Sequence, residues 1–252
     1  TEVENISNSF NVMLGKINQL EESRQEFVSN VSHELKTPLT SMKVLADSLL
    51  TNEDAPAELY REFMGDLSSE IDRENAIITD LLTLVKLDNS SLELSISHTN
   101  ISDLISQVLK MVGPLAQAKN IDIVFESYRT IEADVDQIKL SMAISNLVEN
   151  AIKYNNNEGW VHVILNADHE YFYIRVQDNG FGIPKDSQDK IFDRFYRVDK
   201  ARSRETGGTG LGLAITKSIV LAHNGEIKLH SEENTGTLFS IKIPLKYIPV
   251  GK

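Results

Sequence analysis

The chain has 252 residues, of which 41% are hydrophobic and 25% charged, and it carries a formal net charge of −12. This length and composition predict a soluble globular protein of one or two compact domains. The negative charge argues against a nucleic-acid partner, because phosphate backbones require a concentrated basic surface. The absence of cysteine excludes disulfides, a thiolate nucleophile and a zinc–thiolate site.

The start of the sequence predicts a fragment. No apolar run reaches the roughly 18 to 20 residues that a membrane-spanning helix needs, and no signal peptide is apparent. The chain begins at Thr1, without methionine and inside a helical pattern. We therefore expect a piece of a longer protein.

The first third of the sequence has the periodicity of two long helices. Apolar residues recur three and four positions apart from Val3 to about Leu50, and again from Leu59 to Val85. The segment 51–58 contains Asp, Asn and Pro, which end one helix and begin another. This pattern predicts an antiparallel hairpin whose apolar stripes need further partners. A four-helix bundle from two chains is the simplest solution, and packing of the hairpin against the rest of the chain is the alternative.

The remainder of the sequence mixes helices and strands. Helix spacing is found in three segments, 101–120, 135–154 and about 209–223. Runs rich in β-branched and aromatic residues predict strands at 121–127, 160–167, 171–178, 225–231 and 237–244. Together these elements indicate an α+β fold with helices laid on one face of a sheet.

A first polar cluster lies in the helical segment 146-NLVENAIKYNNN-157. Asn146, Glu149, Asn150 and Lys153 fall on one helix face, although asparagine is a poor helix former and has no cap to make here. Oxygen donors one turn apart suit Mg²⁺, which shares its other coordination positions with phosphates. The alternative is a polar face that is merely solvated.

A second cluster, 178-DNGFGIP-184, follows a predicted strand. A turn accounts for its glycines, which allow positive φ or close backbone approach. A turn does not account for Asp178, because a carboxylate at a strand end is able to accept the exocyclic amine of adenine. We therefore take Asp178 as the candidate residue that accepts a hydrogen bond from the exocyclic amine of adenine.

A third cluster, 206-TGGTGLGLAITKSI-219, runs four glycines into a helix. The N–H groups that open a helix lie at the positive end of its dipole and form a phosphate cradle. The motif is not a Walker loop, because GK[ST] is absent. The preceding segment 189–206 is basic and aromatic, and predicts a lid that closes over phosphates through Arg197, Lys200, Arg202 or Arg204. An ordinary surface loop is the alternative for this segment.

With 32-SHELKTPL-39 added, these segments resemble the H, N, G1, F and G2 boxes of bacterial sensor histidine kinases of the HisKA subfamily. The similarity covers about residues 24–245, with all five boxes in the family order. It implies a dimeric four-helix bundle built from helical hairpins, followed by a GHKL-type α/β sandwich that binds ATP and Mg²⁺. The implied domains are a signalling helix over 1–23, a hairpin over 24–92 and a catalytic domain over 96–248. Residues 1–17 resemble the end of a HAMP linker, and a plain coiled coil is the alternative.

In this resemblance His33 is the phosphoacceptor. A neutral imidazole has a lone pair on one nitrogen, and a carboxylate such as that of Glu34 can hold the proton on the other. Pro38 removes a backbone N–H opposite the Glu34 carbonyl, which softens the helix at the reactive turn. Thr37 lies one turn beyond His33, and the resemblance implies that its hydroxyl supports phosphatase activity.

The resemblance also assigns a nucleotide site. The implied metal ligands are Asn150 and Asn146, with Glu149 as a helper. The phosphates are assigned to Lys153, Arg197, Lys200, Gly208, Thr209, Gly210, Leu211 and Gly212. The adenine side and the pocket wall are assigned to Tyr154, Asp178, Gly180, Gly182 and Ile183. The chain departs from the family pattern at 155-NNNEGW-160, which is rich in asparagine, and at 234-NTGTLF-239, a loose version of the last glycine turn.

The expected activity is ATP-dependent phosphorylation of His33 in a homodimer, transfer to an aspartate on a response regulator receiver domain, and dephosphorylation of that regulator. We expect membrane attachment only through a region ahead of Thr1, which would make this chain the cytoplasmic part of a membrane receptor. A GHKL ATPase or chaperone-like clamp shares the nucleotide site but has no need of the H box. A silent dimeric scaffold would bind no ATP.

Overall fold

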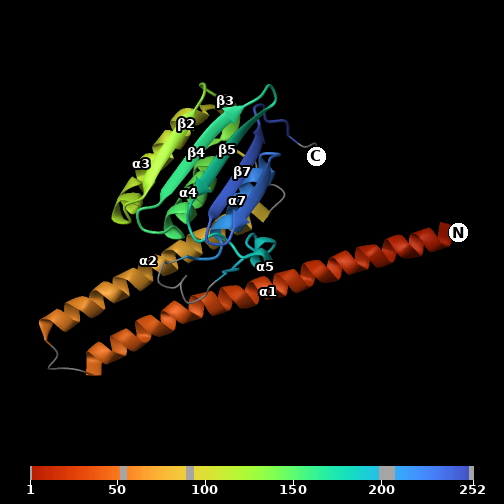
Figure 1. The fold of residues 1–252 in the computed structure, drawn as a ribbon. Helices are drawn as coiled ribbons and strands as arrows, with labels where there is room; N and C mark the ends of the chain where they lie inside the picture. Colours follow the sequence, from red (N-terminus) through yellow and green to blue (C-terminus); the bar gives the residue numbers. More distant parts are fainter. Residues whose placement is uncertain (1, 52–55, 89–93, 199–207, 250–252) are drawn as a thin grey trace. The chain divides into compact units, whose positions relative to one another are not determined.

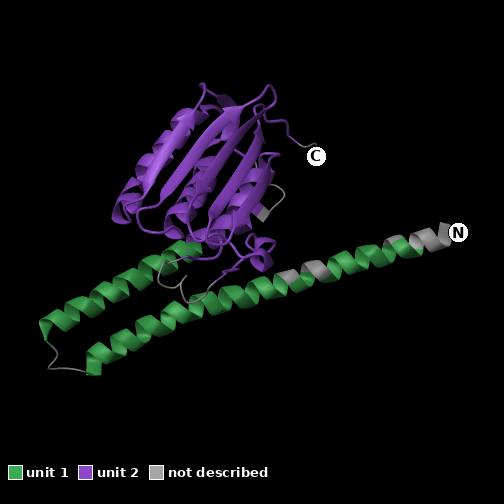
Figure 2. Ribbon diagram, viewed as in Figure 1, with its two compact units in different colours: residues 1–78 green, residues 79–252 purple. Residues whose placement is uncertain are grey.

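The structure is a computed structural model that describes residues 2–51, 56–88, 94–198 and 208–249. It divides into two compact units, Thr1–Ile78 and Thr79–Lys252 (Figure 2). No helix in the described part of the chain is long and apolar enough to span a bilayer.

The first unit is built from two long helices (Figure 1). Helix α1 spans Glu2–Thr51 and α2 spans Ala57–Asp88, with the residues of α2 from Thr79 onward belonging to the second unit. The predicted helical hairpin is therefore confirmed. Many apolar side chains that follow the helix spacing remain exposed in the single chain, among them Phe10, Met13, Leu14, Ile17, Met64 and Ile71.

The second unit contains a five-stranded sheet in the order β2-β4-β5-β7-β6. Its strands are β2 (Asp122–Ser127), β4 (Trp160–Ala167), β5 (Tyr171–Asp178), β6 (Glu226–Glu232) and β7 (Gly236–Pro244). Strands β2 and β4 are parallel, and the other neighbours are antiparallel. All five strands were predicted from their β-branched and aromatic runs.

Three helices lie along one face of this sheet (Figure 1). They are α3 (Ile101–Ala118), α4 (Gln137–Lys153) and α7 (Gly212–Ala222). Alternate strand residues meet the apolar sides of these helices in one buried cluster, which includes Ile144, Leu147, Val148, Val161, Val163 and Leu165. A short helix α5 (Lys185–Gln188) follows the turn after β5. The predicted α+β arrangement, with helices on one sheet face, is confirmed.

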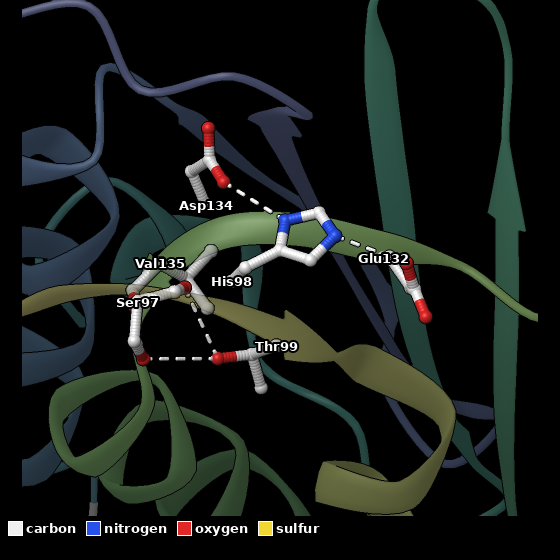
Figure 3. Close-up of polar contacts among 6 residues, drawn as sticks. All are labelled: Ser97, His98, Thr99, Glu132, Asp134 and Val135. Atoms are coloured by element: carbon white, nitrogen blue, oxygen red, sulfur yellow. Dashed lines mark hydrogen bonds and ion pairs between the residues drawn. The ribbon is translucent and has the colours of Figure 1, made fainter.

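A second, two-stranded sheet was not predicted. Strand β1 (Ile96–Asn100) pairs antiparallel with β3 (Glu132–Asp136), and Figure 3 shows the polar side chains on this pair. Asp136 ends β3 and caps α4, where its side chain accepts the Lys139 N–H at 3.1 Å. Helix α4 therefore begins at Gln137 rather than at Val135, because the cap residue stays extended.

Candidate functional site

His33 lies on α1 with an exposed side chain, at a groove within the first unit. The groove has a volume of ≈ 740 Å³ and lies between the two helices of the hairpin. Besides His33 it is lined by Lys36, Thr37, Thr40, Ser41, Val44, Leu45, Asp66, Ser69 and Glu70. The imidazole is thus accessible from solvent, beside a groove in which most of the lining residues are polar.

The turn around His33 contains the three residues that the sequence singled out, Glu34, Thr37 and Pro38, and Glu34 is partly buried. Pro38 is buried inside α1, and the helix continues through it to Thr51. The Thr37 hydroxyl donates to the His33 carbonyl oxygen at 3.1 Å. Such a bond to the carbonyl four residues back is typical of threonine in helices. The lone pairs of this hydroxyl remain able to accept a hydrogen bond from a water.

In the second unit, the polar face of α4 meets the start of α7. The Asn146 amide donates from Nδ2 to the Gly212 carbonyl oxygen at 3.2 Å. Its carbonyl oxygen Oδ1 is the remaining coordinating atom of that amide. This bond joins the predicted metal-binding face directly to the predicted phosphate-binding glycines.

The other members of the α4 face form a local ion pair. Glu149 lies 3.1 Å from the Lys153 ammonium and accepts the Ser145 hydroxyl at 3.0 Å. Asn150 is partly buried one turn before Tyr154. Because Lys153 is paired in this way, the face carries no excess positive charge.

Asp178 lies at the end of β5 and is 8% exposed. Its Oδ1 accepts the Gly180 N–H at 2.9 Å and the Thr237 N–H at 3.2 Å. Burial raises the pKa of the Asp178 carboxyl from 3.8 to about 6, against the opposing effect of these two hydrogen bonds. The carboxylate is thus held rigidly and is poorly solvated, as suits a recognition group.

The glycines after Asp178 are required by close backbone contacts. A Cβ on Gly180 would lie 2.3 Å from the Tyr154 carbonyl oxygen. Gly182 has a φ of +67°, and its Cβ would lie 2.0 Å from the Glu232 carbonyl oxygen. The turn therefore fits only without side chains at these two positions.

The third predicted cluster lies at the start of α7. Gly210 has a φ of +73°, and its carbonyl oxygen accepts the Phe195 N–H at 2.9 Å. The Leu211 N–H donates to the Thr209 hydroxyl at 3.2 Å, and α7 begins at Gly212 rather than near Thr209. A Cβ on Gly208 would lie 3.3 Å from the Tyr154 hydroxyl, which places the end of α4 beside this segment.

The remaining predicted site residues differ in their placement. Ile183 is partly buried, and its N–H donates to the Ser231 hydroxyl at 2.9 Å. Arg197 is partly buried in the segment after α5. Lys200, Arg202 and Arg204 lie outside the described residues, together with the rest of the predicted lid from 199 onward.

A buried histidine ties α4 to the far end of α7. His223 is 1% exposed, its Nε2 accepts the Asp136 N–H at 3.0 Å, and its Nδ1 is 2.8 Å from the Ile219 carbonyl oxygen. These partners assign the proton to Nδ1. Burial lowers the pKa of His223, so the ring is neutral at physiological pH.

Three residues near the site were not predicted. Thr237 donates its backbone N–H to Asp178, whereas Asn155 and Asn179 bind the backbone of Trp160. Asn155 and Thr237 lie in the two segments that depart from the family pattern, and this departure was the only sequence signal for them. Each acts through contacts between distant segments, and spacing along the chain does not reveal such contacts.

The donor set suits magnesium triphosphate. In the described part of the chain, no group of three or more His, Cys, Asp or Glu side chains is arranged to hold a metal. Amide oxygens of Asn146 and Asn150 are hard ligands, and Mg²⁺ retains waters and phosphate oxygens in its other positions. The Asn146–Gly212 contact places these amides beside the start of α7, where N–H groups favour an anion.

The comparisons identify the class of protein. Residues 23–90 match the His Kinase A (phospho-acceptor) domain, and residues 135–247 match the histidine kinase-, DNA gyrase B- and HSP90-like ATPase family. The chain therefore belongs to the bacterial sensor histidine kinases.

Similar proteins are known by sequence and by structure. The sensor protein kinase WalK of Staphylococcus epidermidis is 43% identical over 236 residues, which cover 92% of this chain and 38% of WalK. The structure of full-length ShkA in complex with AMPPNP is 28% identical, with a TM-score of 0.65 over 88% of this chain and 46% of ShkA. The histidine kinase ThkA in complex with the response regulator TrrA is 22% identical, with a TM-score of 0.72 over 91% of this chain and 66% of that one, and shares the fold. The chain thus spans well under half of WalK.

Proposed function

We propose that this chain is an ATP-dependent autokinase that phosphorylates His33 and then passes the phosphoryl group to an aspartate of a response regulator. The observation that carries the proposal is the Asn146–Gly212 hydrogen bond, which joins a metal-binding face to a phosphate cradle. The exposed imidazole of His33 supplies a nucleophile in the first unit. The binding of AMPPNP by ShkA supports ATP as the substrate.

Adenine recognition is assigned to Asp178. At pH 7 the carboxyl is mostly ionised even with its raised pKa of about 6, so it can accept a hydrogen bond from the exocyclic amine. Its bonds to the Gly180 and Thr237 N–H groups hold the acceptor in one direction. Guanine has a carbonyl oxygen where adenine has the amine, and two acceptors facing each other repel. The site therefore favours adenine nucleotides.

Phosphate binding is assigned to the start of α7 and to Lys153. Asn146 and Asn150 would hold Mg²⁺, with Glu149 as a helper through its contact with Lys153. When bound, the ion neutralises charge that develops on the phosphate oxygens. Arg197, together with Lys200 from the segment outside the described residues, is proposed to approach the γ-phosphate.

In the proposed transfer, His33 displaces ADP from the γ-phosphorus of ATP. A ring nitrogen of His33 attacks the γ-phosphorus, an N–P bond forms, and the P–O bond to ADP breaks. The proton on the opposite ring nitrogen passes to the Glu34 carboxylate or to solvent, so that the phosphorylated ring is neutral. ADP leaves with the electron pair of the broken bond. A receiver aspartate then takes the phosphoryl group from the labile N–P bond.

The groove beside His33 is the proposed docking place of the receiver domain. It begins at the reactive histidine, and its polar lining from Thr40, Ser41 and Ser69 suits a transient partner. Thr37 lines the same groove and is proposed to orient water when the regulator is dephosphorylated. Thr37→Ala should lose this phosphatase activity and keep His33 labelling, whereas Thr37→Ser should keep both.

A homodimer is proposed from the exposed apolar side chains of the hairpin. Phe10, Leu14, Ile17 and Ile71 remain in water in the single chain, although they follow a helical stripe. Burial of each such side chain stabilises by about 1.5–3 kcal/mol. A second copy of the chain would cover Ile71 in a four-helix bundle, and the signalling helix 1–23, which carries Phe10, Leu14 and Ile17, would continue as a paired helix. Membrane attachment through a preceding region remains part of this proposal.

Labelling with γ-labelled ATP and Mg²⁺ tests the proposal. We expect acid-labile label on the parent and on His169→Ala, in which another exposed histidine is removed, and no label on His33→Ala. Undiminished label on His33→Ala would refute the acceptor assignment. Steady ATP turnover without a phosphoprotein would favour a GHKL ATPase, and a parent that binds no ATP would favour a silent scaffold.

A further inference from the structure

Two asparagines, Asn155 and Asn179, bind the backbone of Trp160 at the start of β4, and Asn156 bonds to both of them. Asn155 and Asn156 follow the end of α4, and Asn179 lies in the turn after β5, directly beyond Asp178. We refer to Asn155, Asn156 and Asn179 as the asparagine clamp. None of the three belongs to the nucleotide contacts assigned above.

Two of these amides hold the peptide groups of one residue from opposite sides. The Trp160 N–H donates to Oδ1 of Asn179 at 2.7 Å. The Trp160 carbonyl oxygen accepts from Nδ2 of Asn155 at 3.0 Å. The start of β4 thus becomes a bridge between the end of α4 and the turn that carries Asp178.

Asn155 is the buried member of the clamp, and its surroundings are closely fitted. Asn155 is 2% exposed, and its Oδ1 accepts the Asn156 N–H at 2.9 Å, so both ends of the amide have partners. A Cβ on Gly159 would lie 2.4 Å from Oδ1 of Asn155 and 2.9 Å from Oδ1 of Asn179. The two amide oxygens therefore enclose Gly159 and leave no room for a side chain.

Two further bonds join the same segments directly. The Phe181 N–H donates to the Tyr154 carbonyl oxygen at 3.1 Å, and Nδ2 of Asn156 donates to the Asn179 carbonyl oxygen at 3.4 Å. The turn from Asp178 to Phe181 is therefore attached to the last residues of α4. That helix end carries Lys153 and Tyr154.

We propose that the asparagine clamp consists of positioning residues for adenine nucleotides. A bound nucleotide must reach Asp178 with its base while its phosphates reach Lys153 and the start of α7. The clamp sets the distance between these two ends, because it ties the Asp178 turn to α4 through amides that are themselves held. The inference rests on the proposed nucleotide site and extends it to residues that do not contact the ligand.

A positioning role differs measurably from a purely structural one. Loosening the Asp178 turn weakens the contact with the exocyclic amine, which ATP makes and GTP does not. The reacting phosphates, held by α4 and α7, keep their geometry once ATP is bound. The clamp therefore acts on KM and on discrimination between bases, and leaves kcat unchanged.

The test compares Asn155→Ala and Asn179→Ala with Asn157→Ala, which removes an exposed asparagine from the same segment. Dissociation constants for ATP and GTP, the KM and kcat of His33 labelling, and thermal midpoints are measured in the full chain. A lost hydrogen bond of ordinary strength corresponds to about a five- to tenfold change. We expect each clamp variant to weaken ATP binding by this factor, with GTP binding and kcat within about twofold of the parent. Asn157→Ala should match the parent throughout.

Other outcomes would overturn either the positioning role of the clamp or the proposed function of the chain. Equal weakening of ATP and GTP binding together with a lowered thermal midpoint would overturn the positioning role and leave a structural one. Parent-like ATP affinity in both clamp variants would overturn it as well. Asn179→Ala keeps the test decisive if Asn155→Ala fails to fold, because Asn179 is only partly buried. A parent protein that binds no ATP would instead overturn the proposed function.

Discussion

Asp80, near the end of α2, accepts a hydrogen bond from the Thr209 hydroxyl at 2.8 Å. Both residues belong to the second unit, and Thr209 also accepts the Leu211 N–H at 3.2 Å. Burial raises the pKa of the Asp80 carboxyl, which the Thr209 hydrogen bond opposes; Glu149 raises it further and Lys153 lowers it. A negative charge therefore lies against the segment proposed to hold phosphates.

Asp80→Asn should strengthen ATP binding. The amide oxygen can still accept from Thr209, but the charge that repels the phosphates is gone. For partly exposed charges we expect a gain of about two- to fivefold in affinity, smaller at high salt. Titration with ATP at two ionic strengths measures it. Glu126→Gln, which removes an exposed charge from β2, should bind ATP like the parent. Unchanged or weaker binding by Asp80→Asn would contradict the expected repulsion.

Asp178→Asn should weaken ATP binding and stabilise the fold at the same time. The pKa of this carboxyl is raised from 3.8 to about 6, so the folded protein holds the proton more tightly than the unfolded chain does. Its ionisation therefore lowers stability as the pH rises through about 6. At pH 8 the variant should gain up to about 2 kcal/mol in free energy of unfolding. Denaturant unfolding at pH 5 and pH 8 measures the difference, which should vanish at pH values near 4.

The same carboxyl predicts a pH dependence of ATP affinity. In the parent, affinity should fall as the pH drops through about 6, because the protonated group no longer accepts the exocyclic amine. The affinity of Asp178→Asn should be low at every pH. Comparing variant and parent at each pH removes the effect of the nucleotide's own protonation. A parallel pH profile for the two proteins would exclude Asp178 as the titrating group.

His98 should titrate above its ordinary pKa. Its Nδ1 lies 3.0 Å from Asp134 and its Nε2 lies 3.0 Å from Glu132, both across the β1–β3 ladder (Figure 3). These carboxylates raise the pKa of His98, with Asp134 the larger cause. Both ring nitrogens of His98 donate hydrogen bonds only when the ring is charged. The contribution of these contacts to the stability of the fold is therefore fully present below about pH 6.5, and it disappears as the pH rises through the folded-state pKa.

NMR titration of the imidazole checks this prediction. The pKa of His98 should fall in Asp134→Asn and, by less, in Glu132→Gln, whereas that of the exposed His169 should not change. A His98 pKa insensitive to both substitutions would mean that the ring does not bridge the carboxylates in solution.

Gly182→Ala should destabilise the second unit. Its positive φ strains any residue with a Cβ, and that Cβ would meet the Glu232 carbonyl at 2.0 Å. Strain and overlap together cost about 2–5 kcal/mol. Gly208→Ala is the matched control, because its Cβ meets only the end of the Tyr154 side chain, at 3.3 Å. Thermal unfolding of both variants should show a large decrease for the first and a small one for the second.

Much of the fold was predictable because its long elements have strong periodicity. The two hairpin helices and all five strands of the main sheet follow apolar spacing or β-branched runs. Strands β1 and β3 escaped prediction because they are short and polar, with sequences ISHTN and EADVD. Val135 and Asp136 also continue the helical spacing of α4, and only the extended Asp136 cap separates strand from helix.

The site residues that the sequence predicts all belong to motifs, whereas the contacts that it did not predict join segments far apart in the chain. Asp178, Asn146 and the glycines before α7 stand in recognisable strings. The Asp80–Thr209 bond joins residues 129 positions apart, and the Asn179–Trp160 bond crosses between two strands. Such pairings depend on sheet register and on the approach of helices, which the order of residues alone does not specify.

Helices α4 and α7 are fastened to each other twice, by Asn146 to Gly212 at one end and by Asp136 to His223 at the other. These two hydrogen bonds oppose sliding or rotation of α7 along α4. Any shift of α7 relative to α4 on ligand binding would therefore have to break one of these two hydrogen bonds. We therefore expect α4 and α7 to keep their relative positions when a nucleotide binds at the start of α7.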